Sequence, residues 1–329
     1  MVISKTPLRV SFFGGGTDYP EYYEEHGGEV LSTSINQYVY VTVSRLNPLF
    51  EHRIRVAYSK TELVRTVSEI AHPCVRNALE WLGIDSGIEI SVTTDLPARS
   101  GLGSSSSFTV GLLHALYAFK GKLVSQEQLA LDAIHLEQKV IGEKVGSQDQ
   151  VAAALGGFRR ITFARSPVFR ADPLPLSLER KAELQRHMLL FFTGITRFSE
   201  DVLDEQKKRT QVNLATLAAM REQVAAASEM LCGNAFHVRD FGRLLHEAWE
   251  SKQRLSSKIS NSSVNEAYDR ARKAGAYGGK LLGAGGGGFL LVLAPPESHA
   301  AVTKALEPLV VAGAAFEDDG TRLIHLQLS

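Results

Sequence analysis

The pattern of hydrophobic and polar residues divides the chain into a first part rich in strands and a second part rich in helices. Alternating or β-branched runs predict three early strands, at residues 39–43, 54–58 and 88–92. Helical spacing of apolar residues follows at 68–82, 104–119 and 126–141. The helix at 104–119 is apolar on most of its faces, so we expect it to be buried.

The second part of the chain follows a segment, residues 158–176, that contains three prolines and shows no clear period. We therefore expect an α+β fold of two domains, residues 1–165 and 166–329. Beyond the boundary, buried strands are predicted at 188–192 and 289–293, and helices at 199–231, 238–256 and 264–275. The sequence contains no internal repeat.

Composition and charge exclude several classes of protein. The 329 residues include 36 basic and 36 acidic side chains, and this balance argues against a strongly basic nucleic-acid binder. Any phosphate-binding site must then be local. Cys74 and Cys232 form no disulfide framework, and no apolar run suggests a signal peptide or a membrane span. We therefore expect a cytoplasmic protein that binds neither nucleic acid nor membrane.

The strongest local signal is the glycine-serine segment at residues 94–107, which joins a predicted strand to the apolar helix. Glycines let the backbone approach an anion closely, and free N–H groups of a helix's first turn favour negative charge. The segment therefore predicts a phosphate cradle, although a flexible loop with an ordinary serine cap would have the same composition. It lacks the Walker A pattern, which disfavours a P-loop fold.

Two further glycine-rich loops lie near the ends of the chain. Residues 9–20 begin with Arg9 on a short apolar strand and place Thr17 and Asp18 just after three glycines, where Asp18 could meet sugar hydroxyls. Residues 278–288 lead from a helix into a strand, the reverse of the dinucleotide-binding order, so we reject a Rossmann fold. Taken alone, the first loop could be a hairpin turn and the second a tight helix-to-strand turn.

Together the three loops resemble, in order and separation, the three motifs of the GHMP kinase superfamily. The resemblance implies an N-terminal domain like domain 2 of ribosomal protein S5 and a ferredoxin-like C-terminal domain. Residues 14–20 and 279–288 most resemble the branch of bacterial D-glycero-D-manno-heptose 7-phosphate kinases. That branch phosphorylates the anomeric oxygen of a sugar phosphate for nucleotide-activated heptose synthesis, which supplies lipopolysaccharide, capsule or S-layer glycans.

The resemblance also implies cofactors, partners and site residues. ATP and Mg²⁺ are the expected cofactors, a small sugar phosphate is the expected substrate, and a homodimer is a candidate assembly. By position, Asp149 would orient or deprotonate the sugar hydroxyl, and Arg9 would keep Asp149 ionised. Ser105 and Glu137 match the family's magnesium ligands. The expected ATP-binding residues are Asn36, Pro97, Arg99, Ser100, Gly101, Leu102, Gly103, Ser104, Ser105 and Ser106. The expected substrate-binding residues are Gly15, Gly16, Thr17, Asp18, Arg197, Ser199, Lys280, Gly285 and Gly286.

Several of these residues also have plain structural interpretations. Glu137 could be a solvated helix residue near Lys139, and Asp149 a helix N-cap. Ser199 could form a capping box, and Lys280 could lie in solvent.

Other activities remain open at this stage. Gly15 and Gly16 stand where galactokinases carry a Glu-His pair, which argues against galactose. Another anomeric sugar kinase, such as a fucose- or galactose-type enzyme, is the nearest alternative. A decarboxylase of the diphosphomevalonate type and a catalytically silent sugar sensor are more distant ones.

Overall fold

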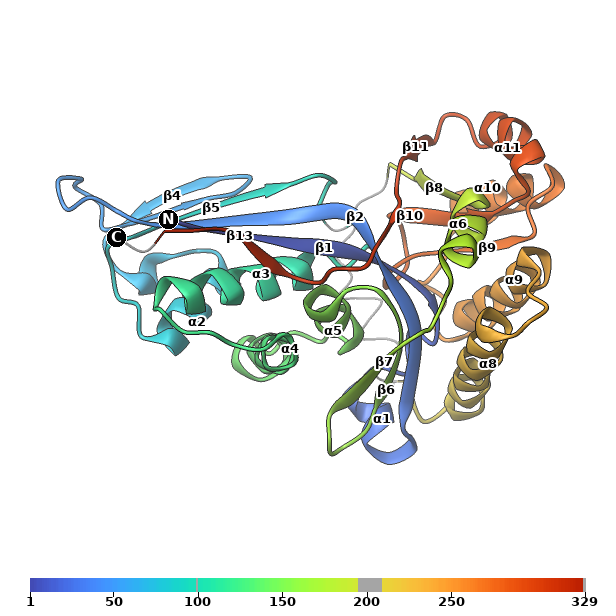
Figure 1. Ribbon diagram of the computed structural model, residues 1–329, viewed down its shortest axis with the longest axis horizontal. Coiled ribbons are helices and arrows are strands. Elements are labelled where there is room, and N and C mark those ends of the chain that lie inside the picture. Colours follow the sequence, from blue (N-terminus) through green and yellow to red (C-terminus); the bar gives the residue numbers. More distant parts are fainter. Residues whose placement is uncertain (99, 195–208, 328–329) are drawn as a thin grey trace.

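The computed structural model describes residues 1–98, 100–194 and 209–327, which form two lobes (Figure 1). Arg99, Arg197 and Ser199, three of the predicted site residues, lie outside the described residues. One lobe is built on a nine-stranded sheet and the other on a four-stranded sheet. No helix in the described part of the chain is both long enough and apolar enough to cross a bilayer.

The first lobe is a largely antiparallel sheet with helices against one face (Figure 1). Its main strand order is β13-β1-β2-β5-β3-β4, and β6 and β12 also pair with β2, while β7 pairs with β6. The strands are β1 (Val2–Phe13), β2 (Gly28–Arg45), β3 (Ile54–Ala57), β4 (Thr61–Val64), β5 (Ile88–Thr94), β6 (Phe158–Phe163), β7 (Phe169–Pro173), β12 (Phe316–Glu317) and β13 (Arg322–Leu326). The helices are α1 (Pro20–His26), α2 (Pro73–Leu82), α3 (Ser104–Phe119), α4 (Gln126–His135) and α5 (Gln148–Leu155), with a π-helical turn at Leu136–Ile141 after α4.

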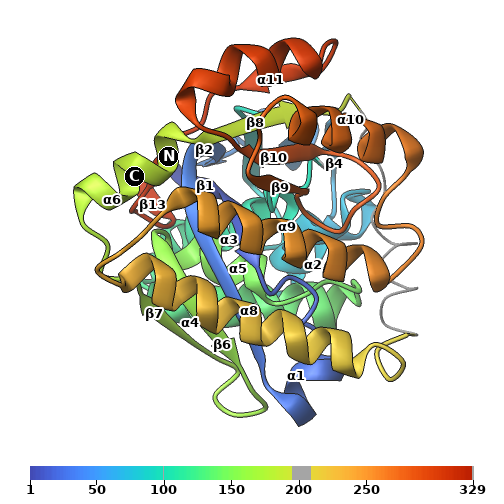
Figure 2. The same ribbon diagram turned by 90° about the vertical axis from the view of Figure 1, so that its right-hand side faces the viewer.

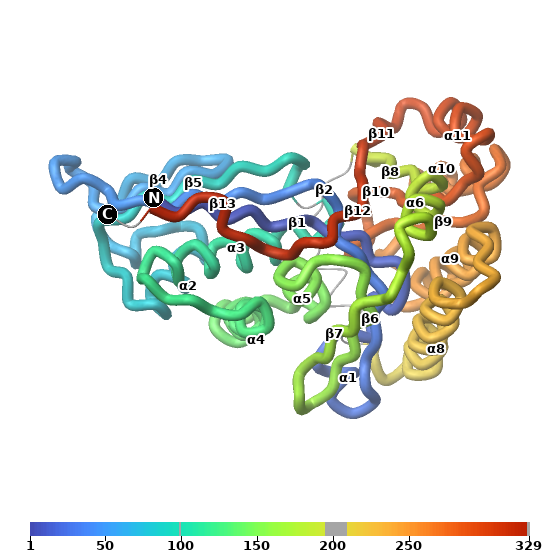
Figure 3. The backbone as a smooth tube through the Cα atoms, in the orientation of Figure 1, coloured from blue at the N-terminus to red at the C-terminus, as the bar shows by residue number. Residues whose placement is uncertain are grey.

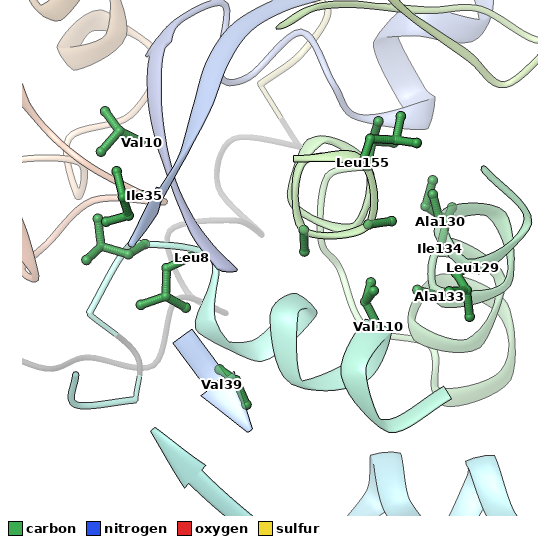
Figure 4. Close-up of a cluster of buried hydrophobic side chains, with 14 of the residues drawn as sticks. Leu8, Val10, Ile35, Val39, Val110, Leu129, Ala130, Ala133, Ile134 and Leu155 are labelled. Atoms are coloured by element: carbon green, nitrogen blue, oxygen red, sulfur yellow. The ribbon is translucent and has the colours of Figure 1, made fainter. Parts of the chain in front are cut away.

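The core of this lobe explains why α3 is apolar nearly all round. Figure 4 shows Leu8 and Val10 of β1 on one side of the cluster and small side chains of α4, such as Ala130 and Ala133, on the other. Val110 of α3 lies in the same buried cluster and has no exposed surface. Because α3 is enclosed by the sheet, α4 and α5, an apolar residue is favoured on most of its faces.

The second lobe consists of an antiparallel four-stranded sheet and its helices. The strand order is β11-β8-β10-β9, with β8 (Met188–Phe192), β9 (Gly278–Leu281), β10 (Phe289–Leu293) and β11 (Val310–Ala312). The helices are α6 (Leu178–Arg186), α8 (Leu214–Cys232), α9 (Val238–Arg254), α10 (Ser262–Lys273) and α11 (His299–Ala305). Helices α8 and α9 run side by side along the lobe (Figure 2).

The end of the chain returns to the first lobe, so a single division near residue 165 does not describe this structure. After β11 the chain runs back along the first sheet, where β12 pairs with β2 and β13 with β1 (Figure 3). Strand β7 also lies beyond residue 165 and pairs with β6 in the same sheet. The hydrophobic pattern cannot reveal this, because pairing with a distant sheet edge depends on backbone hydrogen bonds.

Most predicted helices are present, with shifted ends. The helix expected at 68–82 begins only at Pro73, since proline is favoured in a helix's first turn. The helix expected at 126–141 becomes π-helical from Leu136. Of the helix expected at 199–231, the described part begins at Leu214. The segment at 158–176, which shows no clear period in the sequence, contains the hairpin of β6 and β7.

Candidate active site

The three glycine-rich loops meet where the two lobes join. The first loop (residues 14–19) follows β1, the second loop (residues 95–103) precedes α3, and the third loop (residues 282–288) joins β9 to β10. The second loop is held between the strands that flank the other two loops. The backbone N–H of Arg9 on β1 donates to the carbonyl of Leu102, and that of Phe289 at the start of β10 donates to the carbonyl of Ser100, both at 3.0 Å. The sequence prediction that these loops share one site is thus consistent with their positions.

Two glycines allow the second and third loops to touch through their backbones. Gly101 and Gly283 both adopt positive φ angles, +82° and +76°. A Cβ on Gly101 would lie 2.5 Å from the carbonyl oxygen of Leu282, and a Cβ on Gly283 would lie 2.5 Å from the Cα of Gly101. Glycine is therefore required at both positions for two independent reasons, the backbone angle and the space.

Arg9 and Asp149 form a bidentate ion pair beneath the second loop. Arg9 donates from Nε to Oδ1 of Asp149 at 2.7 Å and from Nη2 to Oδ2 at 2.8 Å. Its Nη1 donates to the carbonyl of Gly101 at 2.7 Å. The Arg9 side chain is 3% exposed, whereas that of Asp149 is 25% exposed. The guanidinium thus holds the carboxylate in a fixed orientation, and the carboxylate remains accessible to a substrate.

The N-terminus of α3 is open to an anion. Its N-cap is Gly103, which has no side chain to cap the first turn. Ser100 is completely buried, and its Oγ has no hydrogen-bond partner among the described residues. The Ser105 side chain is exposed on the first turn, and Pro97 is exposed at the start of the loop. A helix N-terminus with hydroxyls and an unpaired buried hydroxyl nearby fits a polyphosphate.

Glu137 is buried, and Ser106 rather than Ser105 donates a hydrogen bond to it. Ser106 Oγ lies 3.0 Å from Oε2 of Glu137, and Gln150 Nε2 donates to the same oxygen. The other carboxylate oxygen, Oε1, is buried without a partner in the described part of the chain. Burial raises the pKa of Glu137 to about 7. An unpaired buried carboxylate oxygen fits a hard cation such as Mg²⁺, which prefers oxygen ligands.

The predicted substrate-binding residues of the first loop are used largely within the protein. Thr17 is completely buried, and its hydroxyl interacts with the carbonyls of Gly14 and Glu29 and accepts from the N–H of Glu29. Asp18 accepts from the N–H of Gly16 at 2.9 Å and, more weakly, from that of Gln148 at 3.3 Å. Burial raises the pKa of Asp18, while the bond from Gly16 opposes this rise.

The remaining predicted residues contact the backbone of other segments. Lys280 is 2% exposed and donates to the carbonyl of Phe12 at 3.0 Å, so it does not lie in solvent. The N–H of Gly286 donates to the carbonyl of Ile259, and a Cβ on Gly285 would lie 2.6 Å from the same oxygen. Asn36 accepts, through Oδ1, from the N–H of Ala315. These contacts attach the segments around the site to one another.

Lys252, which the sequence did not single out, lies near the charged groups of the site. It is 5% exposed on α9, and its ammonium donates to the carbonyl of Gly283 at 2.6 Å. Arg9, Asp18 and Asp149 are close enough to influence its pKa. A signal was present in the sequence, because Lys252 continues the apolar stripe of Phe241, Leu245 and Trp249 at helical spacing.

Comparison with known proteins finds the same family that the three loops resemble. Residues 58–157 match the profile of the GHMP kinases N terminal domain, and residues 234–307 match the GHMP kinases C terminal profile. The chain therefore belongs to the GHMP kinase superfamily. Its relatives there include kinases with a sugar acceptor and also mevalonate kinases, and the relatives at 28–29% identity over 92–93% of this chain are sugar kinases. It is a GHMP-type sugar kinase.

Individual relatives are similar over nearly the full chain. The D-glycero-alpha-D-manno-heptose 7-phosphate kinase of Campylobacter jejuni is 29% identical, over 92% of both chains. The L-fucokinase/L-fucose-1-P guanylyltransferase of Bacteroides fragilis is 28% identical, over 93% of this chain and 36% of the longer relative. A solved D-glycero-D-manno-heptose 1-phosphate kinase from Bacteroides thetaiotaomicron superposes with a TM-score of 0.79 at 27% identity, covering 99% of this chain and 100% of the other.

Proposed function

We propose that this sugar kinase transfers the γ-phosphoryl group of ATP to the anomeric hydroxyl of D-glycero-D-manno-heptose 7-phosphate, giving the 1,7-bisphosphate. The observation that carries the proposal is the bidentate Arg9–Asp149 pair beside the uncapped N-terminus of α3. The name of the Campylobacter jejuni relative, a heptose 7-phosphate kinase, supports this acceptor, and the name of the solved heptose 1-phosphate kinase supports only a heptose kinase in general.

Each group in the site has a role in this reaction. The first turn of α3 and the second loop would bind the ATP phosphates through N–H groups and hydroxyls. Asp149 would accept the proton of the anomeric hydroxyl, while Arg9 fixes its orientation. Glu137 and the exposed hydroxyl of Ser105 would hold Mg²⁺, with Ser106 positioning the carboxylate. Bound Mg²⁺ would neutralise charge on the phosphate oxygens.

The first test is turnover with an amide in place of the proposed base. We expect Asp149→Asn to lower kcat by about 10²–10⁴, because the amide cannot accept the hydroxyl proton. ADP release should be measured with the heptose 7-phosphate, the free heptose, L-fucose and D-galactose, and the phosphorylated carbon of the product identified by ³¹P NMR. Asp240→Asn is the matched control, since Asp240 is a surface residue of α9 that is 52% exposed.

Several outcomes would contradict the proposal. Wild-type turnover by the Asp149→Asn variant would remove Asp149 from the mechanism. Faster turnover of L-fucose would instead assign the activity of the fucokinase relative. Release of carbon dioxide from diphosphomevalonate would replace the kinase reaction altogether.

A further inference from the structure

Lys252 is a buried cation that no described carboxylate neutralises directly. It occupies the last turns of α9, on the face that Phe241, Leu245 and Trp249 bury. No ion pair involves Lys252 within the described residues, and its ammonium donates to the carbonyl of Gly283. An ammonium has three N–H groups, so two remain for a ligand. Burying a charge without a partner is costly, which suggests that an anion completes the site.

The ammonium lies close to Gly15, where an added Cβ would make only ordinary van der Waals contacts. The position that a Cβ of Gly15 would occupy is 3.4 Å from Nε2 of Gln148, 3.6 Å from Oγ of Ser11 and 3.8 Å from Nζ of Lys252. Ser11 donates its only O–H to Oε1 of Gln148 at 2.7 Å, which leaves the NH₂ end of this amide as a donor toward the same position. We name this position beside Gly15 the Gly15 niche. The Gln148 amide and the Lys252 ammonium are both donors there, so the niche suits an anionic oxygen.

The niche is next to the reacting groups. Gln148 immediately precedes Asp149, and Ser11 lies two residues after Arg9, on the same face of β1. Lys252 is also tied to the third loop, whose Gly283 contacts Gly101 of the second loop. The ammonium thus contacts the third loop and lies close to Gly15 of the first loop, and the third loop in turn contacts the second loop, which is proposed to bind ATP.

Arg9 is less available than Lys252 to bind an anionic ligand. Three of its five N–H groups are already used, two on Asp149 and one on the carbonyl of Gly101. Lys280, the other buried lysine, donates to the carbonyl of Phe12. Of these three cations, Lys252 is therefore the one best placed to bind a phosphoryl group that passes from ATP at the second loop to a sugar at the first loop.

We propose that Lys252 is a catalytic residue that binds the phosphoryl group during its transfer, with its oxygens directed toward the Gly15 niche. The inference rests on the proposed phosphoryl transfer but not on the identity of the sugar. In the step, a bond forms between the sugar oxygen and the γ-phosphorus, and the bond from that phosphorus to the bridging oxygen of ADP breaks. The hydroxyl proton passes to Asp149, and Lys252 keeps its protons.

The pH dependence of the reaction gives one signature. Burial and, to a smaller extent, Arg9 lower the pKa of Lys252 to about 8, although Asp18 and Asp149 oppose this shift. Lys280 faces the same cluster, and burial, Lys252 and Arg9 hold its pKa well below the usual value. Because only protonated Lys252 would attract the phosphoryl group, kcat/KM of the wild type should fall as the pH rises through about 8.

The kinetic test uses three variants. Lys252→Met should lower kcat by about 10²–10³, to the same extent with the heptose 7-phosphate and with the free heptose. Lys252→Arg should retain at least a tenth of wild-type kcat and lose the fall above pH 8, because arginine stays charged. Arg243→Met is the matched control on the outer face of α9, where the Arg243 side chain is 58% exposed. This substitution should change kcat by less than about twofold with either sugar.

Two kinetic outcomes would overturn the inference. One is a Lys252→Met variant with kcat within threefold of the wild type. The other is a loss confined to the KM of the phosphorylated sugar, which would assign Lys252 to the distal phosphate of the substrate.

A binding measurement without any sugar tests whether Lys252 contacts the γ-phosphoryl group. Calorimetry should compare ADP with a non-hydrolysable ATP analogue, in the wild type and in the Lys252→Met variant. We expect the substitution to weaken the triphosphate about tenfold and ADP less than twofold, with an unchanged melting temperature. Equal effects on both nucleotides would contradict the inference. If the wild type phosphorylated no sugar, the proposed function would fail while this comparison still tested Lys252.

Discussion

At the scale of single residues, the first loop illustrates how a polar side chain near a site can serve the fold. Thr17 was predicted to contact the substrate, but its hydroxyl accepts from the N–H of Glu29 at 3.0 Å and lies 2.8 Å from the Glu29 carbonyl. These bonds hold the first loop against the start of β2. Thr17 is completely buried, so water cannot replace the hydroxyl if it is removed.

Replacement of Thr17 separates stability from substrate binding. We expect Thr17→Val to lower the free energy of unfolding by about 1–3 kcal/mol, because the N–H of Glu29 loses its side-chain partner. Thr17→Ser keeps the hydroxyl and should recover most of this loss. Urea unfolding measures both variants. A Thr17→Val protein of normal stability but greatly raised KM for the sugar would show that Thr17 binds substrate after all.

At the scale of elements, the second loop is held by contacts on both sides. Strand β1 binds it through Arg9, and the third loop contacts it through Gly283. The phosphate cradle proposed at α3 therefore depends on a segment almost two hundred residues further along the chain. The run of glycines in the third loop is compatible with a well-defined structure because close backbone contacts restrict its conformations.

The contact can be tested by adding one methyl group. Gly101→Ala would place a Cβ 2.5 Å from the carbonyl oxygen of Leu282, and we expect kcat/KM for ATP to fall at least tenfold. Gly87→Ala is the matched control, because Gly87 has a similar φ of +73° but no atom within 4 Å of the added group. It should cost about 1 kcal/mol of stability from the backbone angle alone, with normal kinetics. Equal kinetic effects in both variants would rule out the contact as the cause.

At the scale of the whole molecule, the two lobes are joined at more than one point. The chain passes from the first lobe to the second after β7 and returns after β11, ending in β13 beside β1 (Figure 3). Thr321 in the returning segment donates its N–H to the carbonyl of Ala153, and its hydroxyl pairs with that of Thr6. The last residues of the chain therefore complete the first lobe's sheet and support α5, which carries Asp149.

Removal of the returning segment should destabilise the first lobe. A chain that ends at Gly313 lacks β12 and β13 and leaves Thr6 and the edge of β1 without partners. We expect it to lose more than about 3 kcal/mol of unfolding free energy, measured by circular dichroism in urea. A chain that ends at Gln327 is the control. An unchanged urea midpoint for the shorter chain would show that the returning segment is dispensable.

The local features of this protein follow from short stretches of its sequence. Apolar periodicity located α3 and the buried strands β8 and β10, and the three loops identified the family, because each of these signals lies within a short stretch of chain. Which distant residues come into contact is seen only in the folded chain. The pairing of β13 with β1, the donation by Ser106 to Glu137, and the burial of Lys252 beside the Gly15 niche all join distant segments. Such contacts depend on how helices and sheets pack, which no local pattern of residues encodes.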